Sequence, residues 1–378
     1  MSFIYEVIND KEVEIISYNG NEEFLIIPSF AFLENKVYKV VSIAKFALNN
    51  KFIKKLFIPE SIKNIHKLCF LGFKNIILEE IIVDSNNKYY CSKDGVLYTK
   101  DESIIIKYPP LKEGHTFSIS KKVQIISSSC FENSLLKELT LPSKVKIIED
   151  YAFSYCENLK FIKLSKNLEE IHDFAFYNCY SLANIKLPSK VHTLKEGVFT
   201  FVDKSITNIE ISKNNKHFSI FKGGLYNKER TILYKYFSSD EIVKLSSSLE
   251  IIKPYAFAYS FLNTVILPST LKSIEHHAFY SSTIVNIEIP SLIDVINIST
   301  FENCKYLNNV ILPTNLKEIN SFAFLSCKKL ENLLLPNTIN KLGTSFISST
   351  KIRKINIPEN ILSIADDAFK GSLVKYNY

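Results

Sequence analysis

Two kinds of apolar spacing alternate along the chain. In "KFIKL" (160–164), the apolar residues Ile162 and Leu164 alternate with Phe161 and Lys163, which is typical of a short strand with one buried face. The apolar positions of the preceding stretch are spaced by four, one, three and three residues, at Ile148, Ala152, Phe153, Cys156 and Leu159. That second spacing predicts the inner stripe of a short helix or helical turn.

The two patterns together form one unit, L-P-x-x-[LV]-x-x-I-x-x-x-A-F-x-x-C-x-x-L-x-x-[IV]-x, that recurs along the chain. Its phenylalanine lies at Phe70, Phe131, Phe153, Phe176, Phe199, Phe257, Phe279, Phe301, Phe324, Phe346 and Phe369, and Leu48 takes that place in the first unit. One unit cannot bury its apolar side alone, whereas a stack of units can. The sequence therefore predicts an α/β solenoid of about twelve 22–23-residue units with a parallel sheet on one face.

Two of the intervals are longer and contain related inserts. Residues 86–108, "NNKYYCSKDGVLYTKDESIIIKY", align without a gap with residues 214–236, "NNKHFSIFKGGLYNKERTILYKY". Asp94-Gly95 and Gly223-Gly224 predict tight turns, and hence hairpin inserts over 84–118 and 212–244. The segments "FIYEVI" and "VEIISY" predict two strands of a β cap over 1–27. We interpret 1–378 as a single solenoid domain.

The repeated unit, the "DGVLY" insert and the opening "YEVINDKEVEIISYNGNEEFLIIPS" resemble the BspA-type leucine-rich repeat family. The resemblance implies a leucine-rich repeat fold and a non-catalytic, protein-binding role. It further implies a cell-surface adhesion protein that binds a host or extracellular-matrix protein. No signal peptide is recognisable at the N-terminus. The alternative is therefore an intracellular, cytoplasmic scaffold or recognition module of the same fold.

Charge and composition narrow the function classes. The net charge is +7 and comes almost entirely from lysine, because Arg230 and Arg353 are the only arginines. A lysine excess spread along the chain favours a solvated surface and predicts no nucleic-acid partner, although an anionic partner stays open. The nine glycines form no phosphate-binding loop, and no apolar run is long enough to predict a transmembrane segment. We expect neither an enzyme nor a cofactor.

Cysteine and histidine are the candidate reactive or metal-binding residues. Six of the seven cysteines occupy inward repeat positions, which predicts buried, reduced thiols; they are Cys69, Cys130, Cys156, Cys179, Cys304 and Cys327. The recurrence of cysteine at one repeat position and the odd total of seven cysteines argue against a disulfide framework. His276 and His277 are adjacent on the expected helical arc, where neighbouring side chains diverge. We therefore predict no metal site and no catalytic site.

The outward face of the parallel sheet is the candidate binding surface. Its polar column comprises Asn184, Asn208, Asn286, Asn309 and Asn332, and its apolar positions include Ile266, Ile311 and Leu334. Apolar residues bordered by polar groups are typical of a protein interface, although isolated apolar surface residues are also ordinary. A second candidate is the set of insert tyrosines, Tyr89, Tyr90, Tyr98, Tyr108, Tyr226, Tyr234 and Tyr236. Strand alternation predicts that about half of them point inward.

Overall fold

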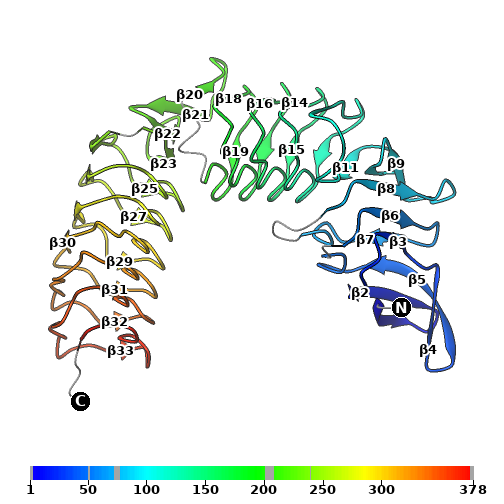
Figure 1. The fold of residues 1–378 in the computed structure, drawn as a ribbon. Coiled ribbons are helices and arrows are strands. Elements are labelled where there is room, and N and C mark those ends of the chain that lie inside the picture. The colour runs from blue at the N-terminus through cyan, green and yellow to red at the C-terminus, as the bar shows by residue number, and fades with distance from the viewer. Residues whose placement is uncertain (1–2, 50–51, 72–76, 201–207, 239, 375–378) are drawn as a thin grey trace. The chain divides into compact units, whose positions relative to one another are not determined.

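The computed structural model describes residues 3–49, 52–71, 77–200, 208–238 and 240–374. The chain divides into two compact units, Met1–Asn214 and Asn215–Tyr378, and each is described by itself (Figure 1). Both consist of stacked turns of short parallel strands. The interpretation of 1–378 as a single domain stays a prediction.

The expected parallel strands form one side of each turn, and we call them face strands. In the first unit they are β3 (Phe24–Ile26), β6 (Lys55–Ile58), β8 (Glu80–Val83), β12 (Thr116–Phe117), β14 (Glu138–Thr140), β16 (Phe161–Lys163), β18 (Asn184–Leu187) and β20 (Asn208–Ile211). In the second unit they are β24 (Ile242–Lys244), β26 (Thr264–Ile266), β28 (Asn286–Glu288) and β30 (Asn309–Ile311). Alternation holds as predicted, because Ile162 is buried while Phe161 and Lys163 are exposed.

The predicted helical arc is wrong: the described residues contain no helix, and the molecule is a β-solenoid rather than an α/β solenoid. Two-residue strands, which we call back strands, take part of its place. In the first unit they are β7 (Asn64–Ile65), β13 (Ile125–Ile126), β15 (Ile147–Ile148), β17 (Glu170–Ile171) and β19 (Thr193–Leu194). In the second they are β25 (Ile251–Ile252), β27 (Ser273–Ile274), β29 (Val295–Ile296), β31 (Glu318–Ile319), β32 (Lys341–Leu342) and β33 (Ser363–Ile364).

Backbone hydrogen bonding explains why a helix-like apolar spacing gives no helix. After β15, the Phe153 N–H donates to Ala175 of the next turn at 2.8 Å, whereas the Ser154 N–H donates back to Tyr151 at 2.9 Å. Tyr151 and Tyr155 have positive φ angles of 58° and 57°. An α-helix needs consecutive bonds to residue i−4 and negative φ throughout. The apolar side chains therefore face inward from tight turns that bond to their neighbours.

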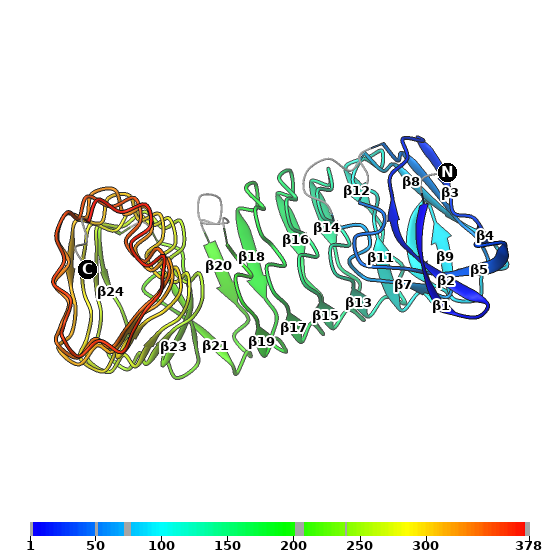
Figure 2. The same cartoon turned by 90° about the horizontal axis from the view of Figure 1, so that it is seen from below.

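The repeat phenylalanines form stacked columns inside each unit. Ring centroids of Phe131 and Phe153 lie 5.0 Å apart, and those of Phe153 and Phe176 lie 5.3 Å apart. In the second unit the stack runs through Phe257, Phe279 and Phe301, at 4.7 and 5.2 Å. Figure 2 shows these second-unit turns lying over one another. Offset stacking of buried rings adds to the burial of their apolar surface.

Antiparallel strands occur in the predicted cap and in both predicted inserts. At the N-terminus, β1 (Phe3–Asn9) and β2 (Glu12–Tyr18) pair as predicted, whereas β4 (Phe30–Leu33) and β5 (Lys36–Ile43) form a second hairpin beyond the predicted cap of 1–27. The first insert comprises β9 (Tyr90–Lys93), β10 (Val96–Thr99) and β11 (Ile104–Lys107). The second comprises β21 (Phe218–Phe221), β22 (Gly224–Asn227) and β23 (Ile232–Tyr236).

The second hairpin turn is one residue earlier than predicted. Lys222 and Gly223 have φ angles of 43° and 74°, matching 50° and 73° at Asp94 and Gly95, whereas Gly224 already belongs to β22. Each insert also continues into the solenoid, because β11 pairs in parallel with β13 and β23 pairs with β25. Each insert therefore supplies a strand on which a ladder of back strands begins, rather than projecting from the side of an existing ladder.

Candidate functional site

The face strands of the second unit line a groove of about 640 Å³. Outward side chains of β26, β28 and β30 form its floor, and Ile266 and Ile311 are 49% and 50% exposed. Asn286 and Asn309 are direct strand partners, and both line the groove. Glu288 is the one charged residue among its lining side chains. This groove combines apolar side chains with amide and hydroxyl groups, which suits contact with another protein surface.

The predicted face residues fall into two separate groups. Ile266, Ile311, Asn286 and Asn309 share the second-unit groove, and in the next turn Asn332 and Leu334 are exposed, Leu334 by 80%. Asn184 is exposed on β18 of the first unit and lines a groove there. Asn208 begins β20, and its side chain lies outside the described part of the chain. Their exposure matches the alternation, and their binding role stays a prediction.

The first-unit groove has a different character and a volume of about 800 Å³. Phe161, 49% exposed, lies in it beside Lys163, Lys166 and Lys186. Glu210, its one acidic lining residue, forms an ion pair with Lys186 at 3.0 Å. The net charge of the whole chain does not reveal this local basic character. The lysine that recurs in the turns after the five face strands from β12 to β20 is the sequence signal for it.

Most of the insert tyrosines lie in the core. Tyr90, Tyr98, Tyr108, Tyr226 and Tyr236 are buried, somewhat more than the predicted half, whereas Tyr89 is 47% exposed. Tyr108 stacks on Phe131 at 5.2 Å, and Tyr236 lies 5.3 Å from Phe257, so both take the place of the repeat phenylalanine. Burial raises the pKa of Tyr108 and of Tyr226 to about 12. The rings of Tyr108 and Tyr236 therefore extend the phenylalanine columns.

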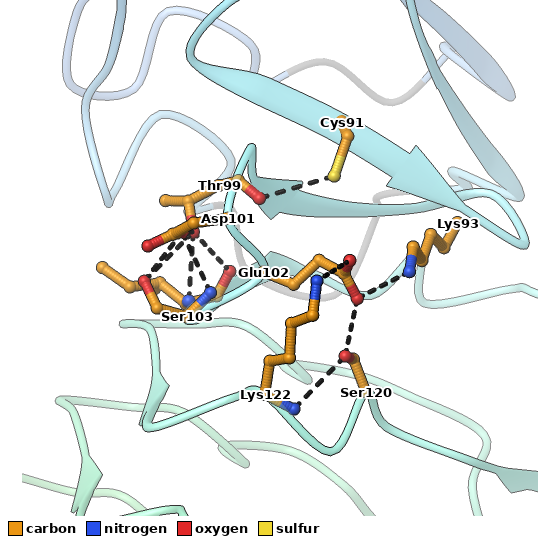
Figure 3. Close-up of polar contacts among 9 residues, drawn as sticks. Cys91, Lys93, Thr99, Asp101, Glu102, Ser103, Ser120 and Lys122 are labelled. Atoms are coloured by element: carbon orange, nitrogen blue, oxygen red, sulfur yellow. Dashed lines mark hydrogen bonds and ion pairs between the residues drawn. The ribbon is translucent and has the colours of Figure 1, made fainter.

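The densest polar cluster surrounds Glu102 in the first insert (Figure 3). Its carboxylate accepts bonds from Lys93 Nζ at 2.6 Å, Ser120 Oγ at 2.7 Å and Lys122 Nζ at 3.1 Å. These partners, Lys93 foremost, lower the pKa of Glu102 to about 2. An ionised, fully hydrogen-bonded carboxylate is a poor general acid or base at neutral pH. The cluster therefore fixes the loop between β10 and β11.

The cysteines are free, and the six at inward positions are buried as predicted. Cys156 Sγ donates to the Phe131 carbonyl at 3.0 Å, and Cys304 Sγ donates to Phe279 at 3.0 Å. Burial raises the pKa of Cys304 to about 12 and that of Cys91, which is partly exposed, in the same direction. Thiols held protonated are weak nucleophiles.

The predicted divergence of His276 and His277 is wrong. Their Nδ1 atoms lie 3.1 Å apart, because the residues lie in a turn in which His277 has a φ of 56°, and not on a helix. The His277 ring also stacks on Tyr255 at 5.0 Å, and burial lowers its pKa to about 4. Within the described ranges, no three His, Cys, Asp or Glu side chains converge as metal ligands. The described part also has no helix long and apolar enough to cross a bilayer.

Comparison with known proteins connects this geometry to a family. A structure of a leucine-rich cell surface protein from Faecalibacterium prausnitzii is 20% identical, with a TM-score of 0.60 over 100% of this chain and 97% of that one. The pneumococcal vaccine antigen PcpA is 21% identical, with a TM-score of 0.50 over 97% and 84%. At this identity the likeness shows the fold alone. Among curated proteins, none matches this sequence.

The family assignment rests on the repeat itself. The model of the BspA-type leucine-rich repeat region matches residues 10–94, 113–223 and 233–375, which is well over half of the chain. These ranges include the face strands that line both grooves. The chain belongs to the BspA-type leucine-rich repeat family.

Proposed function

We propose that this protein binds another protein non-catalytically, through the second-unit groove, and that it does so as an adhesion protein at a cell surface. The observation that carries the proposal is the exposure of Ile266 and Ile311 in the groove and of Leu334 on the turn after Ile311. Glu288 takes the corresponding place on the turn between Ile266 and Ile311. Exposed apolar side chains that are held on a rigid sheet lose little entropy on binding, so they suit contact with a partner. The leucine-rich cell surface protein of the same fold supports the location.

A binding assay with a matched control tests the groove. Purified extracellular-matrix proteins would be coated on a surface and probed with the intact chain and with Ile266→Lys, Ile311→Lys and Leu334→Lys combined. Removing apolar contacts at an interface centre costs about 2 kcal/mol or more per main contact, so we expect binding to fall at least thirty-fold.

The control carries the same three added charges elsewhere on the unit. Phe261, Ile298 and Tyr306 are comparably exposed and do not line the groove, and their replacement by lysine should leave binding within about two-fold. Equal losses in both variants would refute the groove as the binding site. Binding to a cytosolic partner alone, with no surface labelling of intact cells, would favour the intracellular scaffold instead.

A further inference from the structure

A row of exposed lysines borders the first-unit groove. The turn after each of the five face strands β12, β14, β16, β18 and β20 carries a lysine: Lys121, Lys144, Lys166, Lys190 and Lys213. Lys122, beside Lys121, pairs with Glu102 at 3.1 Å and is not counted among the five. All five are exposed, and within the described ranges none forms an ion pair. We call them the lysine rim.

The solenoid sets the spacing of this rim. Adjacent turns are directly bonded there, because Ser165 Oγ and Asn167 Nδ2 both donate to the Ser143 carbonyl, at 3.1 and 2.8 Å. Parallel strands lie about 4.8 Å apart, so five turns place the rim lysines along a line of about 20 Å. Like charges held so close repel one another, and they favour an anion that spans them.

The groove beside the rim adds complementary contacts. Lys163 also points into it, and its hydroxyl and amide groups come from Thr140, Ser143, Asn184 and Ser189. Phe161 presents a half-exposed ring among these polar groups. The groove thus offers cations, hydrogen-bonding groups and one flat apolar ring along a single line.

The second unit shows that the fold does not require this charge. The corresponding turns carry Ser247, Ser269, Ser291, Thr314 and Asn337, with no lysine at these positions. The second-unit groove has Glu288 and no lysine in its lining. Two grooves of the same construction therefore differ in charge.

We propose that the lysine rim and the first-unit groove bind a linear sulfated polysaccharide. A chain with sulfates at regular intervals matches a row of separate cations on successive turns better than the curved, mixed-charge surface of a folded protein does. Nucleic acid is disfavoured because planar arginine forks recognise phosphates and bases, and the first unit has no arginine. Hydroxyl and amide side chains in the groove suit a ligand rich in hydroxyl groups.

Binding of a fluorescent heparin dodecasaccharide to the full chain tests the proposal. The combined variant Lys144→Gln, Lys166→Gln and Lys190→Gln should raise the Kd at least ten-fold, and Phe161→Ala should raise it several-fold. The matched control replaces Lys305, Lys328 and Lys329, three exposed lysines of the second unit, with glutamine and should stay within two-fold. Unaltered circular dichroism and thermal unfolding would show that each variant is folded.

Two competitors decide the class of ligand. Unsulfated heparosan and poly-glutamate should displace the probe at least ten-fold less well than heparin. An equal loss of heparin affinity in the rim and control variants would refute this binding site. Displacement of the probe by poly-glutamate as effectively as by heparin would refute the polysaccharide as ligand and favour an acidic protein segment. The Ile266, Ile311 and Leu334 variant should bind heparin normally, so the failure of either proposal is recognisable separately.

Discussion

At the scale of single residues, one repeat position holds four of the seven cysteines. Three residues after the phenylalanine, Cys179 Sγ donates to Phe153 and Cys327 Sγ donates to Phe301, each at 3.1 Å. Other turns place a buried serine there, at Ser134, Ser260 and Ser282. The position accepts a small side chain with a donor, which cysteine and serine share.

The phenylalanine column should be the most sensitive part of the core. Phe176 is fully buried, with its ring 5.3 Å from Phe153 and 6.0 Å from Phe199. Phe176→Ala should lower the free energy of unfolding by about 3–5 kcal/mol, because it leaves a cavity in a stacked core. Urea unfolding followed by circular dichroism measures this value.

The exposed ring on the neighbouring face strand provides the control. Phe161→Ala should change the free energy of unfolding by about 0.5 kcal/mol or less, since its ring is half-exposed on β16. Similar losses for both variants would contradict the assignment of inward and outward positions.

At the scale of elements, the two inserts share one backbone conformation but are stabilised by different side-chain contacts. Glu102 and Arg230 occupy the same position, each with a φ of 62°. Glu102 pairs with Lys93 at 2.6 Å, whereas the Arg230 guanidinium lies 4.3 Å over the ring of Phe221, which corresponds to Lys93. The first contact is an ion pair and the second is a cation–π contact. Only the first contains a carboxylate, which acid protonates.

Acid should therefore weaken the first insert selectively. The pKa of Glu102 falls from its ordinary 4.5 to about 2 on folding, so its stabilising contribution is complete above about pH 4.5 and is lost as the pH falls towards 2. Glu102→Gln should flatten the pH dependence of the free energy of unfolding between pH 5 and 2. An unchanged slope would show that the carboxylate is not held as described.

The inserts also bury one lysine each, which no spacing rule anticipates. Lys107 Nζ donates to the Ser129 carbonyl at 2.8 Å, and Lys235 Nζ donates to the Ala258 carbonyl at 2.9 Å. Burial lowers the pKa of Lys107. Both ammonium groups donate to carbonyls of the next tight turn, so neither buried charge is left without a hydrogen bond. A lysine can therefore be an inward residue when turns replace a helix.

At the scale of the whole molecule, the solenoid buries nearly all of its thiols. Six cysteines are buried and Cys91 is partly exposed, with its Sγ donating to the Thr99 carbonyl at 3.4 Å. No disulfide links them within the described residues.

Thiol titration with Ellman's reagent tests this arrangement. At pH 8 and without reductant, the native chain should expose at most one reactive thiol, Cys91, because the other six are buried and shielded from the reagent. Seven thiols should react in denaturant. Fewer than seven would reveal a disulfide, and several fast thiols in the native chain would contradict the buried ladder.

The sequence alone determined the features that depend on local periodicity. Repetition of the phenylalanine predicted stacked units, and period-two alternation predicted both the parallel face strands and the exposure of Ile266 and Ile311. Asp94-Gly95 predicted its hairpin turn, because few residues tolerate positive φ at both turn positions. The same alternation also predicted that part of the tyrosine set is buried.

Only the tertiary structure decided what depends on bonds between turns. The spacing of Ile148, Ala152 and Phe153 fits a helix and a bonded tight turn equally well. The turn forms because each N–H such as that of Phe153 finds a carbonyl in the next repeat. Stacking also aligned lysines that are 22 to 24 residues apart in sequence into one rim, and it brought His276 and His277 together. A single repeat contains neither its neighbour's carbonyls nor its neighbour's charges, so these features exist only in the stack.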